Sequence, residues 1–182
     1  MRIPLTVGAG LAPTVTTPTA RSDAMPSLSV FDLLTLHDFV ADLPAERLHR
    51  LAAAGRPVFR ATGHRLCHQD TPADRFWLVH SGTVAVDLHV PGRGHIVVEH
   101  VAAGTVVGWS WARAPYLWRF GAVVAEDIRA VEMDAVRVRA MIAEDAELGR
   151  ELNARLLDTV SDRLQAARHR LVELYAYPGA TP

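Results

Sequence analysis

The chain has 182 residues, a net charge of −1 and an apolar fraction of 49%, which predicts one folded domain with tails. All 19 basic residues are arginines, and 20 acids balance them, so the composition gives no support for a polyanionic partner. The single cysteine, Cys67, excludes an intrachain disulfide and a multi-cysteine metal cluster. No apolar run approaches the roughly 18 residues of a membrane span, and we expect a cytoplasmic protein without a membrane anchor.

Residues 1–27 are rich in Thr, Pro, Ala and Gly and have no helical or strand period, which predicts a disordered tail. The segment lacks the sustained apolar core of a signal peptide, and Met25 is an alternative translation start. From Ser29 the pattern becomes helical. Pro44 fits the first turn of a second helix, which Gly55 and Pro57 bring to an end.

Short apolar runs follow, separated by turn signals such as Ser81-Gly82 and the Pro91–Gly94 connection. About eight short strands at this spacing predict a closed or sandwiched β-unit, a jelly roll or β-roll. The runs are Val58-Phe59, Arg65-Leu66, Phe76–Val79, Val84–Val86, Ile96–Val98, Val106-Val107, Ala122–Val124 and Ile128–Met133.

The helical pattern returns after Asp134, with a short helix around Val138 and a long helix from about Ala146 to Tyr175. The long helix carries a narrow apolar stripe flanked by charges, among them Arg163. The stripe could dock on its own subunit or on a second copy of the chain. Because the small β-unit offers no partner of that length, we expect a homodimer. Its contact residues are Leu152, Leu156, Val160 and Leu164, within a stripe that also contains Leu148, Ala167, Leu171 and Leu174.

Three of the four tryptophans lie within ten residues of one another, beside Arg119, in the stretch from Gly104 to Glu126. An aromatic surface next to a guanidinium is a plausible site for a flat, anionic ligand. The alternative is that the tryptophans fill the core and that Arg119 is a solvated charge.

Several motifs resemble the cyclic nucleotide-binding domain over roughly residues 31–175. Gly63-x-x-Leu66, followed by Asp70, Phe76–Val79 and Ser81–Val86, is similar to the first half of that domain. Gly104-x-x-x-Gly108 resembles the glycine pair that opens its phosphate-binding cassette. Arg119-Phe-Gly-Ala-Val-Val-Ala125 partly matches the pattern that closes the cassette. The resemblance implies an α+β fold, a double-stranded β-helix (jelly roll or β-roll) with N-terminal helices over 28–145 and a C-terminal dimer helix with a short tail over 146–182.

In that family, backbone amides at the start of the cassette hold the cyclic phosphate, an arginine pairs with it, and a glutamate holds the ribose 2′-hydroxyl. Arg119 matches the arginine, whereas Trp109 stands in place of the glutamate. The resemblance therefore implies a degenerate pocket in which the phosphate half is kept and the ribose half is lost. The implied ligand-binding residues are Gly108, Trp109, Ser110, Trp111, Arg119 and Phe120.

The Gly108–Trp111 sequence GWSW resembles a subgroup of short, stand-alone Crp/Fnr-like proteins that are often encoded beside hydrogenase and iron–sulfur redox subunits. About seven residues follow Tyr175, with no helix-turn-helix, and we expect no DNA binding. Two functions remain. The first is a sensory module for a cyclic nucleotide or another small anion. The second is a dimeric interaction subunit of a redox enzyme, without a ligand. A cavity near Arg119 would favour the first function, and an indole of Trp109 or Trp111 packed across the pocket would favour the second.

Other chemistry has little support in the sequence. The nearest metal-ligand cluster, His64 and His68 with Cys67, lies on a predicted turn, and we expect no metal site or resident cofactor. No paired carboxylates and no Ser/His/Asp order accompany the aromatic stretch, and we expect no enzymatic activity.

Overall fold

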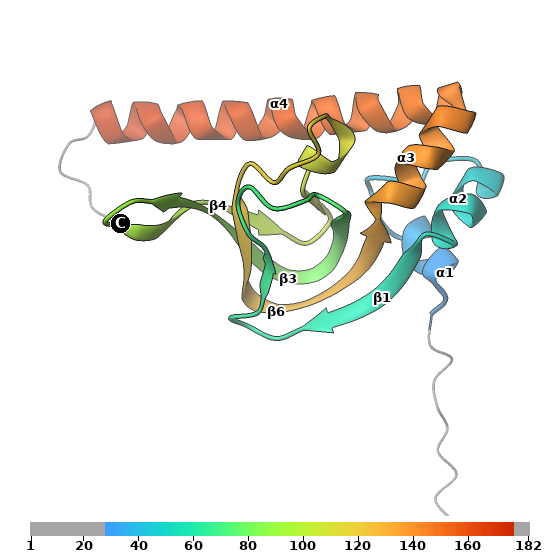
Figure 1. Cartoon of the computed structure of the whole chain (residues 1–182), viewed down its shortest axis with the longest axis horizontal. Helices are drawn as coiled ribbons and strands as arrows, with labels where there is room; N and C mark the ends of the chain where they lie inside the picture. The colour runs from blue at the N-terminus through green and yellow to red at the C-terminus, as the bar shows by residue number, and fades with distance from the viewer. Residues whose placement is uncertain (1–27, 177–182) are drawn as a thin grey trace, which may run out of the picture.

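The computed structural model describes residues 28–176 and contains one antiparallel sheet with helices at both ends of the described chain (Figure 1). The predicted tail over residues 1–27 and the last residues, 177–182, lie outside this description. The elements are α1 (Val30–Thr35), α2 (Ala45–Ala52), β1 (Gly55–Arg60), β2 (Arg65–Cys67), β3 (Arg75–Val90), β4 (Gly94–Ala102), β5 (Val106–Val107), a 3-10 turn η1 (Ser110–Ala112), β6 (Gly121–Asp134), α3 (Ala135–Glu144) and α4 (Ala146–Ala176).

The strands form a six-stranded sheet in the order β1-β6-β3-β4, to which β2 adds by pairing with β6 and β5 by pairing with β3. The predicted α+β roll is therefore present, but with six strands where about eight were expected. The difference arises because β3 and β6 each run through two of the predicted apolar runs. Ser81-Gly82 is an irregularity inside β3, with Gly82 at φ +82° and shifts in the pairing register around it.

Helices α1, α2 and α3 and the start of α4 gather at one end of the roll and share its apolar core, and α4 continues along the length of the roll (Figure 1). The Ser29 hydroxyl caps α1 by accepting the N–H of Asp32, and the Asp134 carboxylate caps α3 by accepting the N–H of Arg137. Arg47 of α2 pairs with Asp145, Glu147 and Glu151, so ion pairs join the N-terminal helices to the C-terminal helices.

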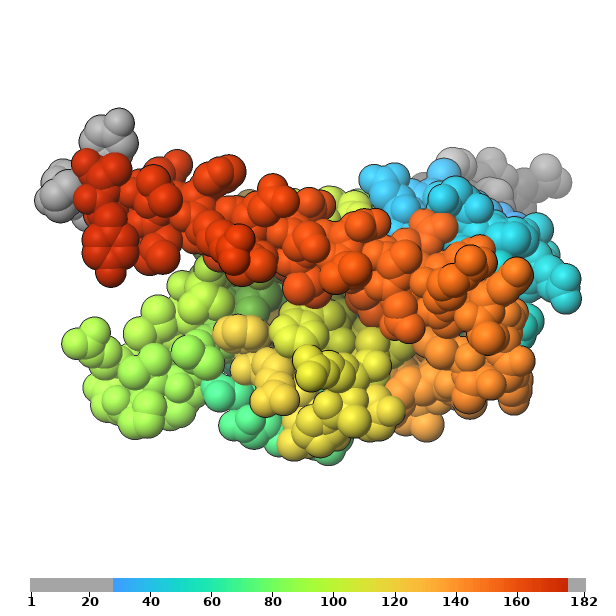
Figure 2. Space-filling model, turned by 90° about the horizontal axis from the view of Figure 1, so that it is seen from above, coloured from blue at the N-terminus to red at the C-terminus, as the bar shows by residue number. Residues whose placement is uncertain are grey.

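The long helix α4 has two different halves. Leu148, Leu152 and Leu156 are buried in the core of their own chain. From Leu164 to Ala176 every residue is exposed, and Figure 2 shows this half of α4 lying along one side of the roll. The structure therefore places Leu152 and Leu156 in the subunit core and not on a face open to a partner. None of the helices within residues 28–176 is long and apolar enough to cross a membrane.

Candidate functional site

The cassette, residues 108–120, leaves β5 and returns to the sheet at β6. Gly108 has φ +95°, and a Cβ at this position would overlap the indole of Trp118. Trp118 is buried and stacks on Trp77 with ring centroids 5.9 Å apart. A glycine is therefore required here, both for the left-handed backbone and for the close approach of the indole.

Trp111 anchors the cassette in the core. Its side chain is fully buried and stacks on Phe76 with ring centroids 4.3 Å apart. Arg139 of α3 donates a hydrogen bond to the Trp111 carbonyl at 3.0 Å and lies 4.4 Å from the ring centre of Tyr116. Of the six predicted ligand-binding residues, Trp111 thus serves packing in this structure and lines neither of the two cavities beside the cassette.

Four of the predicted residues do meet at one cavity of about 570 Å³, here called the outer pocket. Its wall is apolar and aromatic, it contains two exposed arginines, and it has no carboxylate. Within the described residues, neither arginine forms an ion pair, although the backbone N–H of Arg119 donates to the Ser110 hydroxyl at 3.3 Å. The lining residues are Leu88, Trp109, Ser110, Arg113, Ala114, Leu117, Arg119 and Phe120.

A second space, the inner hollow, lies inside the roll and measures about 70 Å³. It adjoins the outer pocket, since Trp109, Ser110 and Phe120 line both. Gly108 lines the inner hollow whereas Arg119 lines the outer pocket, so the two do not converge as the sequence predicts. The remaining wall consists of Cys67, Val86, Val98, Glu99, Val107, Trp118, Gly121, Ala122 and Arg163.

Arg163 reaches the inner hollow from α4. Its Nε lies 3.3 Å from Glu99 Oε1, and its Nη2 donates a hydrogen bond to the Val106 carbonyl. Burial lowers the pKa of Arg163, and the charge of Glu99 opposes that shift. In the sequence Arg163 stands out only as one of the charges that flank the apolar stripe, although its position seven residues after buried Leu156 puts both on one helical face.

The indole that packs against Gly108, in the wall of the inner hollow, is that of Trp118, whereas the sequence suggested Trp109 or Trp111. The sequence could not indicate which tryptophan takes this position, because Trp109, Trp111 and Trp118 all lie in the same short stretch. The close approach of Trp118 to Gly108 is a tertiary feature, because the backbone of Trp118 is hydrogen-bonded to the distant residues Asp70 and Thr71.

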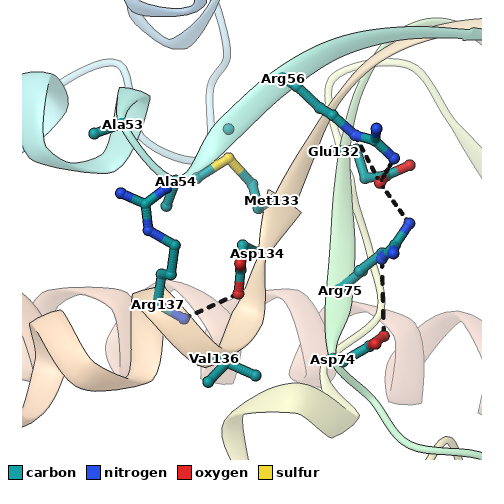
Figure 3. A pocket seen from close by; sticks show the side chains of 11 residues that line it. Ala53, Ala54, Arg56, Asp74, Arg75, Glu132, Met133, Asp134, Val136 and Arg137 are labelled. Atoms are coloured by element: carbon teal, nitrogen blue, oxygen red, sulfur yellow. Dashed lines mark hydrogen bonds and ion pairs between the residues drawn. The ribbon is translucent and has the colours of Figure 1, made fainter.

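A third cavity, of about 410 Å³, surrounds a buried carboxylate at the other end of the sheet (Figure 3). Glu132 accepts hydrogen bonds from Arg56, Arg60 and Arg75 and from the Trp77 indole N–H. Burial acts to raise the pKa of Glu132, but the hydrogen bonds from Arg56 and Trp77 outweigh it and the pKa is lowered. Because three arginines converge on the one buried Glu132 carboxylate and pair with it, this network is best explained as structural.

Cys67, which belongs to the cluster considered for metal binding, is a buried free cysteine. Burial raises the pKa of the Cys67 thiol to about 12, so the thiol is protonated at neutral pH. Within residues 28–176, no group of three or more His, Cys, Asp or Glu side chains is placed to hold a metal ion.

Comparisons with known proteins agree with this architecture. The family model of the cyclic nucleotide-binding domain matches residues 57–145, which include the cassette. A search of curated proteins found no match. A solved protein of Geobacter metallireducens GS-15, assigned to the cyclic nucleotide-binding proteins, is 25% identical with a TM-score of 0.67 over 73% of this chain and 96% of that one.

Two more distant structures share the fold. A cyclic nucleotide-binding domain from Methylobacillus flagellatus KT has 17% identity and a TM-score of 0.64, over 85% of this chain and 84% of that one. The sensor domain of the transcriptional regulator DNR from Pseudomonas aeruginosa has 18% identity and a TM-score of 0.59, over 73% and 89%. On the roll, the cassette and the family match together, residues 57–145 form a domain of the cyclic nucleotide-binding domain family.

Proposed function

We propose that this protein is a ligand-sensing regulatory module whose nucleotide pocket is degenerate and whose ligand, a flat anion, binds in the outer pocket. The observation that carries the proposal is the lining of that pocket. Trp109 and Phe120 offer aromatic surface, and Arg113 and Arg119 offer two cations without a carboxylate to neutralise them. Guanidinium groups beside aromatic faces are suited to a planar ligand with negative charge.

Two features argue against a cyclic nucleotide inside the roll. Trp109 replaces the acid that holds the ribose hydroxyl in the family, and a buried hydroxyl without an acceptor costs about 1–3 kcal/mol. The inner hollow measures only about 70 Å³, because Trp118 and Arg163 enter it. A ligand of drug size usually occupies roughly 300 Å³ or more. The outer pocket, at about 570 Å³, is large enough.

The same module is proposed to be a homodimer through α4 from Leu157 onward, a segment that includes the exposed half of the helix. Apolar residues recur there at alternating spacings of three and four, the repeat of a two-stranded coiled coil. Most of their side chains are largely exposed, Leu164 by 49% and Leu174 by 67%. The repeat consists of Leu157, Val160, Leu164, Ala167, Leu171 and Leu174.

The second candidate function is a dimeric interaction subunit without a ligand, for example of a redox enzyme. The packing of Trp118 across Gly108 favours this alternative, because it leaves little room inside the roll.

Calorimetry with three probes separates the two functions: cAMP, cGMP and naphthalene-2-sulfonate as a flat anion. We expect the sulfonate to bind the wild type and to lose at least tenfold in affinity in Arg119→Ala. Arg93→Ala is the matched control, since Arg93 is an exposed arginine on the β3–β4 turn that lines neither space. Binding of cAMP at micromolar strength, about −8 kcal/mol, would contradict the degenerate pocket. If no probe binds, or if Arg119→Ala and Arg93→Ala behave alike, the ligand-free alternative is favoured.

A further inference from the structure

The inner hollow has one cation and one acid in its wall, Arg163 and Glu99. Both are largely shielded from solvent, with side-chain exposures of 18% and 23%. The cassette arginine Arg119 lines the outer pocket instead. The positive charge inside the roll is therefore supplied by α4 and not by the cassette.

The contact between Arg163 and Glu99 leaves part of the guanidinium free. Glu99 Oε1 lies 3.3 Å from Nε, Nη2 donates to the Val106 carbonyl, and Nη1 forms no hydrogen bond with any described residue. A guanidinium is a planar fork that favours two parallel hydrogen bonds to one oxyanion. The single contact between Arg163 Nε and Glu99 Oε1 does not form such a pair of parallel hydrogen bonds.

The hollow also has a neutral donor. Ser110 is buried and lines it, and its Oγ already accepts the backbone N–H of Arg119 at 3.3 Å. A hydroxyl that accepts one hydrogen bond still has its own O–H to donate. Ser110 can thus complement a guanidinium in binding an anion.

The volume of the inner hollow limits the size of a ligand that can bind there. At roughly 15 Å³ for each water-sized atom, the space of about 70 Å³ holds about five such atoms. A tetrahedral oxyanion has five heavy atoms, whereas a cyclic nucleotide has several times more.

We propose that the inner hollow is a binding site for a small tetrahedral oxyanion of the phosphate or sulfate class, held by the guanidinium of Arg163 and the hydroxyl of Ser110, with Glu99 as its competitor. This site goes beyond the proposed function, because the flat ligand of the outer pocket does not use it. Arg163 is also the last residue of α4 that is not exposed, so the anion binds at the point where the roll holds the free half of the helix.

The test is calorimetric titration of the full chain with inorganic phosphate and with sulfate. We expect Glu99→Gln to bind phosphate at least threefold more tightly than the wild type, because the competing charge is removed while the size of the side chain is kept. Arg163→Ala should lose binding. Arg93→Ala, the exposed arginine that lines neither space, should bind phosphate as the wild type does. The sulfate arm distinguishes a site for tetrahedral oxyanions from one for phosphate alone.

Three outcomes overturn the proposal: no binding of either anion to Glu99→Gln, unchanged or weaker binding in that variant, or a loss of binding in Arg93→Ala equal to that in Arg163→Ala. Because Arg163→Ala could disturb the docking of α4, its circular dichroism spectrum and melting temperature are compared with the wild type. Glu99→Gln decides the question if Arg163→Ala is misfolded. The titration does not involve the flat probe, so a negative result does not bear on the function proposed for the outer pocket.

Discussion

At the scale of single residues, the cassette depends on one glycine and one tryptophan. Gly108 combines a left-handed backbone with direct contact to the Trp118 ring, whereas Gly63 has a similar φ of +85° with no atom within 4 Å of the Cβ that an alanine would add. Alanine variants at Gly63 and Gly108 therefore separate the energetic cost of a left-handed backbone from the cost of steric overlap.

We expect Gly63→Ala to lower the free energy of unfolding by about 1–2 kcal/mol, the usual cost of a left-handed residue with a Cβ. Gly108→Ala should lose at least about 3 kcal/mol, because the Trp118 ring must also move out of a packed position. Urea unfolding of both variants measures the difference. Equal losses would show that Trp118 yields easily and does not fix the cassette.

At the scale of elements, α4 performs two tasks along its length. Its first half buries Leu148, Leu152 and Leu156 in the core, and from Leu164 onward its second half is exposed. The two halves should therefore respond differently to substitution.

We expect Leu164→Glu to convert a dimer to a monomer, because a charge would face its copy across the proposed coiled coil. Leu156→Ala should leave the assembly intact and lower the free energy of unfolding by about 2–5 kcal/mol through the cavity it creates. Sedimentation equilibrium and urea unfolding provide the two readouts. An unchanged dimer in Leu164→Glu would place the interface elsewhere.

At the scale of the whole molecule, a buried histidine joins the helical layer to the sheet. His37, between α1 and α2, is 1% exposed and meets His80 of β3 edge to face at 5.1 Å. Its Nδ1 accepts the backbone N–H of Phe39 at 3.2 Å. Burial, with a smaller contribution from His80, lowers the pKa of His37 to about 4, although Asp38 acts in the opposite direction.

A lowered histidine pKa predicts that stability falls as the solution is acidified. In the unfolded chain His37 takes up a proton near pH 6.5, whereas in the folded chain it does so only near pH 4. The contribution of neutral His37 to the free energy of unfolding is thus complete above pH 6.5. It is lost progressively down to about pH 4, by up to about 3 kcal/mol.

The measurement is the free energy of unfolding between pH 4 and 7. We expect His37→Asn, whose side chain can still accept the Phe39 N–H, to reduce the slope, and His169→Asn on the exposed part of α4 to keep it. A slope unchanged in His37→Asn would assign the pH dependence to other groups.

Local patterns were sufficient for the order of elements and for the class of fold. Strand and helix periods, glycine and proline turns and the cassette motif are short-range features, and they predicted the roll and the long helix. Of the six site residues that the family resemblance implied, Trp109, Ser110, Arg119 and Phe120 line one cavity. The bulge at Gly82 could not be recognised in the same way, because a glycine signals a turn and a strand irregularity alike.

The tertiary structure decided which side chains from distant segments meet. The apolar stripe of α4 was visible in the sequence, but only docking on the subunit divided it into a buried and an exposed half. The same docking brought Arg163 to Glu99 and into the roll, and the folding back of the cassette selected Trp118 to cover Gly108. Such contacts arise from the packing of complementary surfaces, which no single stretch of sequence encodes.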